Sequence, residues 1–200
     1  MSETTLRTIG ILLFDGVEEL DAVGPWEVLS WWTLHHPEDG YEVVTFSDEG
    51  GVVTAAKGLQ LVAQDSKASV PALDVLVYPG GRGTRPWLRD AAELAWVREQ
   101  REQVPLMTSV CTGALVYAAA GLLAGRPATT HWGSLDLLRE LEPTAEVRER
   151  DRFVDDGDLV TASGVSAGID MALHLVDRLA GRERARETRR GIQYDPEPPV

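Results

Sequence analysis

The sequence predicts an α/β fold built on a mainly parallel sheet, and three observations lead to this class. Short apolar runs alternate along the chain with segments of helical periodicity, as right-handed βαβ crossovers require. The first run, Thr8–Phe14, is apolar throughout, which is typical of a strand buried on both faces of a parallel sheet. The 200 residues are 44% hydrophobic and 26% charged, which fits a single globular domain over residues 1–200.

The first half of the chain is expected to form a strand at 8–14, a helix at 17–34, a strand at 41–46, a small β-excursion at 52–55 and 59–62, and a strand at 73–78. Asp15-Gly16 is a turn signal that separates the first strand from the helix. Gly24-Pro25 lies inside that helix, where proline has no amide hydrogen and must kink or restart it. The strand at 73–78 ends at Pro79-Gly80-Gly81.

The second half is expected to form a helix at 86–103, a strand at 106–110, a helix at 112–123, a short strand at 128–130, a helix at 133–141, strands at 153–155 and 159–162, and helices at 166–179 and 182–190. The first of these helices has Leu88, Ala92, Ala95 and Trp96 on one face. Asp156-Gly157 predicts a hairpin between the two strands. Residues 191–200 are expected to form an extended tail, because prolines in its last part prevent both helix and strand pairing.

Composition and charge narrow the function classes. Lys and Arg number 19 against 32 Asp and Glu, so the net charge of −13 disfavours binding to nucleic acid or to anionic membranes. The one cysteine, Cys111, excludes an intramolecular disulfide and fits a reducing compartment. Met1–Thr8 lacks the apolar segment of a signal peptide, and no apolar run is long enough to span a membrane. A cytoplasmic protein is therefore expected.

The single cysteine lies where a parallel sheet binds its ligands, at the carboxyl end of a strand. Cys111 directly follows the strand at 106–110 and has the small residues Ser109 and Gly113 two positions to either side. Small flanking residues are needed where a strand reverses sharply into a helix, so this pattern predicts a cysteine nucleophile elbow. The start of the following helix would favour the thiolate. A buried, inert cysteine is the alternative.

The two other loops at this sheet edge add a backbone site and carboxyl groups. Gly80 and Gly81 let backbone N–H groups approach a substrate closely, as an oxyanion-binding site requires, although a simple tight turn is the alternative. Glu18, Glu19 and Asp21 follow the first strand, and one of them is expected to exchange a proton with the cysteine. Acids are also favoured at a helix N-terminus for electrostatic reasons, which explains one of the glutamates without a catalytic role.

The histidines are weaker candidates. His131 follows the short strand at 128–130 and is placed near the pocket, whereas His174 shares a helix face with charged residues and is expected to be solvated. No set of His, Cys and carboxylate residues has the spacing of metal ligands, so no metal is predicted. The sequence also lacks the glycine-rich phosphate-binding loop and the dinucleotide-binding fingerprint.

These segments together resemble the ThiJ/PfpI superfamily, whose members are related to class I glutamine amidotransferases. The resemblance rests on Ile9–Phe14 (IGILLF), Leu20–Pro25 (LDAVGP), Val77–Gly81 (VYPGG), Thr108–Gly113 (TSVCTG), Ala128–Trp132 (ATTHW) and Ser166–Asp170 (SAGID). Three features are most similar to the isonitrile (isocyanide) hydratase branch: Ser-Val-Cys-Thr-Gly, Ala-Thr-Thr-His-Trp, and the tail Tyr194–Pro199 (YDPEPP). The resemblance implies a flavodoxin-like three-layer sandwich, a homodimer and no cofactor.

The resemblance also assigns roles to individual residues. Cys111 is the implied nucleophile, with Asp21 as its carboxyl partner and Thr112 beside it. The backbone N–H groups of Gly81 and Thr112 are implied to bind developing negative charge, and Val165 corresponds to a position that packs beside the cysteine. The protease and amidase branch typically has histidine after the cysteine, so Thr112 argues against a Cys-His-Glu triad.

The implied reaction is hydration of isonitriles to N-substituted formamides, as in a hydro-lyase. Cys111 would attack the terminal isonitrile carbon, Asp21 would supply a proton, and water would release the formamide from a thioimidate. A small neutral organic substrate needs only an apolar pocket with one thiol and one acid.

Two other functions fit the same cysteine. One is glyoxalase- or deglycase-like aldehyde chemistry through a thiohemiacetal. The other is a redox or ligand sensor in which Cys111 is oxidised to a sulfinate. Regulators in this superfamily carry an additional helix-turn-helix module, and none is apparent before Val200, which favours an enzyme over a DNA-binding protein.

Overall fold

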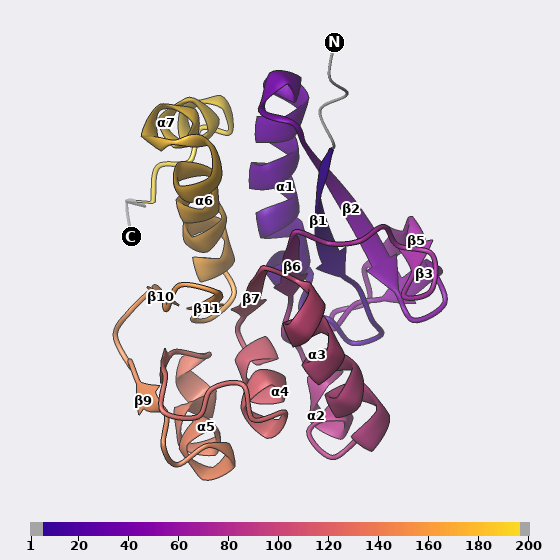
Figure 1. Ribbon diagram of the computed structural model, residues 1–200, viewed down its shortest axis with the longest axis vertical. Coiled ribbons are helices and arrows are strands. Elements are labelled where there is room, and N and C mark those ends of the chain that lie inside the picture. Colours follow the sequence, from indigo (N-terminus) through magenta and orange to yellow (C-terminus); the bar gives the residue numbers. More distant parts are fainter. Residues whose placement is uncertain (1–5, 197–200) are drawn as a thin grey trace.

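The computed structural model describes residues 6–196, and a seven-stranded sheet forms its centre (Figure 1). The strands are β1 (Arg7–Leu12), β2 (Tyr41–Ser47), β5 (Asp65–Ser66), β6 (Val75–Tyr78), β7 (Leu106–Val110), β10 (Phe153–Asp155) and β11 (Leu159–Ala162). They are arranged in the order β10-β11-β7-β6-β1-β2-β5, and all neighbours are parallel except β10 and β11. The prediction of a mainly parallel sheet is confirmed.

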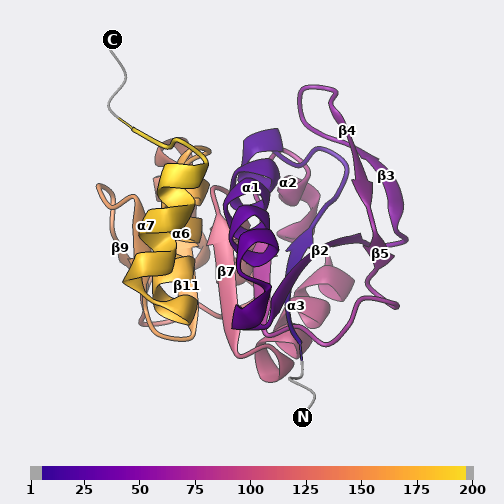
Figure 2. The ribbon, with the colours of Figure 1, turned by 90° about the horizontal axis from the view of Figure 1, so that it is seen from above.

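Helices cover both faces of this sheet, which makes the three-layer arrangement seen in Figure 2. One face carries α1 (Glu19–His35), α6 (Ala167–Ala180) and α7 (Arg182–Gly191), which pack against one another. The other carries α2 (Thr84–Trp87), α3 (Ala91–Gln103) and α4 (Gly113–Ala119), and α5 (Leu135–Leu141) packs against α4. The flavodoxin-like architecture implied by the resemblance is therefore confirmed.

Smaller elements complete the described chain. They are the antiparallel pair β3 (Gly51–Thr54) and β4 (Gln60–Ala63), the parallel pair β8 (Pro127–Ala128) and β9 (Glu146–Val147), and the short 3-10 helices η1 (Pro37–Asp39) and η2 (Trp132–Ser134). Among the described residues, no helix combines the length and the apolar character needed to cross a membrane.

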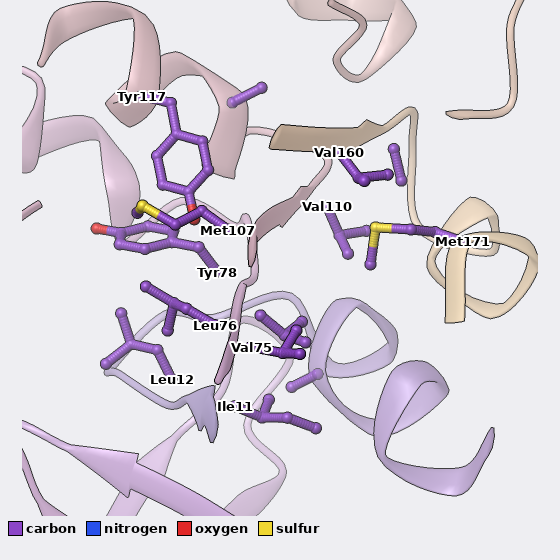
Figure 3. Close-up of a cluster of buried hydrophobic side chains, with 14 of the residues drawn as sticks. Ile11, Leu12, Val75, Leu76, Tyr78, Met107, Val110, Tyr117, Val160 and Met171 are labelled. Carbon is purple, nitrogen blue, oxygen red and sulfur yellow. The ribbon is translucent and has the colours of Figure 1, made fainter. Parts of the chain in front are cut away.

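The core lies on both faces of the central strands, as their continuous apolar runs predict. Alternate residues of one strand point to opposite faces, so Leu76 and Tyr78 project to the same side while Val75 projects to the other (Figure 3). Tyr117 from α4 packs edge-on against Tyr78, with 5.4 Å between the ring centroids. Met171 from α6 fills the opposite face, beside Val110.

The helix expected at 86–103 is wrong in two respects. The chain forms two separate helices there, because the Asp90 side chain caps the second by accepting hydrogen bonds from the N–H groups of Ala92 and Glu93. The expected apolar face is wrong in part: Leu88 and Trp96 pack against the core, but Ala92 and Ala95 are exposed while Glu93 is buried. Glu93 faces inward because it binds Lys67 and accepts a hydrogen bond from the Tyr78 hydroxyl.

Other boundaries differ by a few residues. The helix expected at 112–123 already ends at Ala119, and the strand expected at 128–130 is only Pro127–Ala128. Pro25 neither ends nor restarts α1, which runs through it as one helix. The hairpin around Asp156-Gly157 is confirmed.

The expected tail at 191–200 is partly wrong, because helix α7 continues to Gly191 and a turn follows at Ile192 and Gln193. The Tyr194 hydroxyl donates a hydrogen bond to Asp170 of α6 over 3.0 Å, which holds this part of the chain against that helix. Residues 197–200 of the expected tail and residues 1–5 of the N-terminal segment lie outside the described residues.

Candidate active site

The candidate site lies where four neighbouring strands, β11, β7, β6 and β1, end at the same edge of the sheet. The segments that follow these strands carry Val165, Cys111, Gly80 and Asp21, respectively. Parallel strands bring the residues at their carboxyl ends together, even though these four are widely separated along the chain. Their position confirms the expected sheet edge for the loops after β1, β6 and β7.

Cys111 joins β7 to α4 in an unusual backbone conformation. Its φ is 57°, in the left-handed region that residues with a side chain rarely adopt. The surrounding backbone holds it there, because its N–H donates to the carbonyls of Ala162 (3.1 Å) and Ser163 (2.9 Å). Its own carbonyl accepts a 2.7 Å hydrogen bond from the Thr130 hydroxyl. Strain supported in this way is typical of functional positions.

Gly113 shows why a small residue is needed two positions after the cysteine. A Cβ atom there would lie 2.3 Å from the carbonyl oxygen of Tyr78, so any side chain would push α4 away from the end of β6. Ser109, two positions before the cysteine, is fully buried. The sterically tight reversal that the sequence predicts is therefore present at Cys111.

The Cys111 thiol is only 6% exposed, and its surroundings change its acidity in both directions. Burial is the largest effect and, with the nearby charge of Asp21, raises the thiol pKa to about 12. The backbone N–H groups of Thr112 and Val165 act in the opposite direction and lower the thiol pKa. Burial outweighs them, so the thiol form is favoured, contrary to the thiolate expected from the start of the following helix.

Asp21 lies in the first turn of α1 and has no exposed surface. Its Oδ2 accepts a 3.0 Å hydrogen bond from the Gly80 N–H, whereas no N–H or hydroxyl group of the described residues donates to its buried Oδ1. The carboxyl and the Cys111 thiol are near enough to shift each other's pKa. Burial, with a smaller contribution from the charge of Glu18, raises the Asp21 pKa to about 7. The two groups form a coupled pair that holds a proton near neutral pH.

The other two acids of the first loop have a different partner. Glu18 and Glu19 both form ion pairs with Lys57, and the Glu19 Oε2 lies 3.0 Å from the lysine nitrogen. These contacts attach the loop between β3 and β4 to the start of α1. Of the three acids, Asp21 is therefore the one whose side chain is fully buried and forms no ion pair with the described residues.

The Gly81 N–H differs from its expected role. It donates a 2.8 Å hydrogen bond to the Thr112 hydroxyl oxygen and is therefore not free to bind a developing negative charge. Thr84 adds a second hydroxyl, 3.1 Å from that of Thr112. These contacts fix the glycine loop against the start of α4, so in this structure the Thr112 side chain has a positioning function.

Gly80 also differs from the expected oxyanion-binding role, since its N–H is bound to Asp21. A Cβ atom at Gly80 would lie 2.4 Å from the Thr112 nitrogen and 2.9 Å from Asp21 Oδ2. Glycine is therefore required to let the glycine loop, the carboxyl and the cysteine loop come together. The backbone N–H groups that lower the thiol pKa are those of Thr112 and Val165.

Val165 adopts a φ of 47°, which is strained for a β-branched residue. Its backbone N–H lowers the pKa of the Cys111 thiol, so the residue affects the cysteine through its backbone as well as lining the pocket. The sequence contains no signal for this second contribution, because no periodicity or motif marks a positive φ at valine.

A pocket of about 380 Å³ opens above the sulfur. Its walls are formed by Glu18, Gly81, Arg82, Arg85, Cys111, Thr112, His131, Trp132, Gly133, Ser134 and Val165. The expectation of an apolar pocket fits Val165 and Trp132, but charged side chains lie in the walls as well. No pattern in the sequence marks Arg82 or Arg85 as site residues, although both follow β6 at the sheet edge where ligands are expected.

His131 lies in this pocket, as expected, and packs tightly against Gly164, where a Cβ atom would lie 2.5 Å from its ring. Its Nδ1 accepts a 3.2 Å hydrogen bond from the Gly133 N–H. His174 lies elsewhere and is less solvated than predicted, because it binds Asp155 over 2.7 Å and stacks on Phe153. Within residues 6–196, no three His, Cys, Asp or Glu side chains are grouped to hold a metal ion.

The fold and this site place the chain in a defined class: it belongs to the DJ-1/PfpI family, whose family model matches residues 7–178. The chain is 41% identical to an isonitrile hydratase from Pseudomonas putida over 191 residues, covering 96% of this chain and 80% of that protein. A structure of a ThiJ/PfpI family protein from Pseudomonas syringae superposes with a TM-score of 0.84 at 32% identity, covering 98% and 78% of the two chains.

The family also contains regulators. The HTH-type transcriptional regulator GbdR from Pseudomonas aeruginosa is 32% identical over 178 residues, which are 88% of this chain. The match covers 48% of the regulator, so the chain spans about half the length of that relative.

Proposed function

We propose that the protein hydrates isonitriles to N-substituted formamides with Cys111 as the nucleophile. The observation that carries this proposal is the buried pair of Cys111 and Asp21 at the base of a pocket. The 41% identity to an isonitrile hydratase over most of the chain supports the choice of reaction. Hydration also requires only one nucleophile and one proton donor, which the pair supplies.

In the first step of the proposed reaction, the Cys111 thiol gives its proton to the Asp21 carboxylate, and the resulting thiolate attacks the terminal isonitrile carbon. The Asp21 carboxyl gives its proton to the same carbon, so a thioimidate forms with a new carbon–sulfur bond. The cysteine in its turn between β7 and α4 acts as a nucleophile elbow that presents the sulfur to the pocket. The N–H groups of Thr112 and Val165 stabilise negative charge on the sulfur before the attack and after its release.

In the second step, water adds to the thioimidate carbon. One proton of the water passes to the substrate nitrogen and the other returns to the Asp21 carboxylate. The carbon–sulfur bond then breaks, which releases the formamide and restores the thiolate. Since Thr112 follows the cysteine, a histidine adjacent in sequence has no part in the scheme.

Mass spectrometry of the intact protein after incubation with an aryl isonitrile tests the proposal. A transient mass increase equal to one isonitrile is expected on Cys111, together with formamide in solution. Methylglyoxal supplied in a parallel incubation separates this reaction from aldehyde chemistry at the same cysteine. Turnover of methylglyoxal without formation of formamide contradicts the hydratase assignment.

The similarity to a transcriptional regulator keeps a sensor function as a second candidate. A sensor would gain the mass of oxygen atoms at Cys111 on peroxide treatment and would turn over neither substrate. The same intact-mass measurement, with peroxide in place of isonitrile, identifies this outcome.

We further propose that the protein is a homodimer in the cytoplasm, where a single reactive thiol stays reduced. An apolar groove of about 320 Å³ between α1 and β4 supports the dimer, and its walls include Val23, Trp26 and Val62. Val62 is 65% exposed beside this groove, so a second copy that covered it would remove apolar surface from water. Sedimentation velocity is expected to show a dimer for the native chain and a monomer for Val62→Glu. A monomeric native chain contradicts the proposal.

A further inference from the structure

Two arginines lie in the wall of the candidate pocket, in a protein whose net charge is strongly negative. Arg82 and Arg85 both line the pocket that contains Cys111. The chain as a whole carries a net charge of −13, so an uncompensated cationic site stands out against an anionic surface. The proposed hydration involves a neutral isonitrile group and makes no use of either guanidinium.

Neither arginine forms an ion pair with a carboxylate of residues 6–196, whereas Arg101, Arg126, Arg152 and Arg184 each bind one or more. The only acid in the pocket wall, Glu18, is already paired with Lys57. The two guanidinium charges therefore remain uncompensated at the pocket, and an anionic group entering it would be attracted.

Arg85 is also held in place. Its Nη2 donates a 3.2 Å hydrogen bond to the hydroxyl oxygen of Ser134, which is buried at the end of η2. This contact connects α2 to η2 across the pocket wall and uses one of the five N–H donors of the guanidinium. A positioned guanidinium with free donors matches the paired oxygens of a carboxylate.

We propose that the substrate carries an anionic substituent, a carboxylate in the simplest case, that Arg85 binds with support from Arg82 while the reacting group reaches Cys111. This inference rests on the proposed function for the identity of the reacting group. It revises the expectation of a wholly neutral substrate: the isonitrile carbon is neutral, and the remainder of the molecule is charged.

The first test needs no catalytic turnover. Iodoacetate and iodoacetamide both alkylate the Cys111 thiolate with loss of iodide, and they differ mainly in carrying a carboxylate or a carboxamide. Selectivity is the rate with iodoacetate divided by the rate with iodoacetamide, normalised to the same quotient for the free thiol 2-mercaptoethanol. This normalised ratio is expected to be about 10 for the native protein and about 10-fold lower for Arg85→Gln. Because both reagents attack the same thiolate, a change in its pKa cancels from the ratio.

Arg89→Gln is the matched control, since Arg89 is exposed, forms no ion pair with residues 6–196 and lies outside the pocket wall. Its rate ratio is expected to equal that of the native protein. A ratio unchanged by both Arg85→Gln and Arg82→Gln overturns the proposal.

The second test compares an aryl isonitrile bearing a para-carboxylate with one bearing a para-carboxamide. The native protein is expected to hydrate the carboxylate with about 10-fold higher kcat/KM than the carboxamide, and Arg85→Gln to lower this preference about 10-fold. If the two isonitriles are hydrated equally and the ratio of iodoacetate to iodoacetamide rates does not depend on Arg85, the inference is overturned and the proposed function stands. If neither isonitrile is hydrated but the ratio of iodoacetate to iodoacetamide rates depends on Arg85, the proposed function is overturned and anion recognition at the pocket is supported.

Discussion

Cys111→Ala is expected to reduce formamide formation from an aryl isonitrile by at least about 1000-fold, because no other group in the pocket can form the thioimidate. Alanine fits the space of the thiol and leaves the backbone contacts of residue 111 in place. The variant should therefore fold normally, with an unchanged midpoint of thermal unfolding. The rate of formamide release is the measurement.

Cys111→Ser provides the matched control for the chemistry. A hydroxyl preserves a polar group of similar size, but it ionises far less readily than a thiol and is a weaker nucleophile. We expect a loss of at least about 100-fold for this variant. Formamide production at the native rate by either variant contradicts the covalent mechanism.

Asp21→Asn is expected to reduce hydration by about 100- to 10,000-fold while leaving the thiol able to react with iodoacetamide. The amide has no acidic proton to give to the isonitrile carbon, so the thioimidate step fails. The charge of Asp21 raises the thiol pKa, so its removal lowers that pKa and speeds alkylation near neutral pH. Hydration and thiol reactivity are thus expected to change in opposite directions.

Glu19→Gln is the control for this substitution, because Glu19 lies in the same helical turn but binds Lys57 rather than the cysteine. It should retain hydration within about twofold of the native rate. An Asp21→Asn variant with native activity excludes the carboxyl as the proton donor.

The same Asp21→Asn variant has an expected effect on stability that depends on pH. Burial raises the Asp21 pKa from 3.8 to about 7 in the folded state, so between these values the folded chain retains a proton that the unfolded chain has released. The free energy of unfolding of the native protein therefore falls as pH rises through this window. The total loss above about pH 7 reaches at most about 4 kcal/mol.

Asparagine does not titrate and avoids this loss. We expect Asp21→Asn to be more stable than the native protein by roughly 2–4 kcal/mol near pH 8, and the difference to disappear near pH 4. Urea unfolding of both proteins across this range measures it. A stability difference that does not vary with pH indicates that Asp21 is not buried as a raised-pKa acid.

Much of the fold was predictable because its signals are local. The apolar runs that became β1, β6 and β7 identify a parallel sheet, and Asp156-Gly157 identifies the hairpin between β10 and β11. Where local signals compete, the predictions were less accurate. Asp90 divided an expected helix because a capping side chain two residues before Ala92 outweighed continuous helical periodicity.

The site was predictable in part for the same reason. The small residues around Cys111 are visible in the sequence, because a sharp reversal restricts side-chain size within a few positions. The strained φ of Val165 and the positioned guanidinium of Arg85 leave no such trace. Both depend on neighbours from other elements, Cys111 in the first case and Ser134 in the second.

The sequence by itself determined the class of fold and the position of the one thiol at the end of a buried strand. Only the tertiary structure decided what surrounds that thiol. It separated Asp21 from Glu18 and Glu19, because a hydrogen bond from Gly80, 59 residues away, holds one carboxyl fully buried while Lys57 forms ion pairs with the other two. It also assigned the Gly81 N–H to Thr112 rather than to a ligand. Hydrogen bonds and burial depend on distances between remote parts of the chain, and no local pattern encodes those distances.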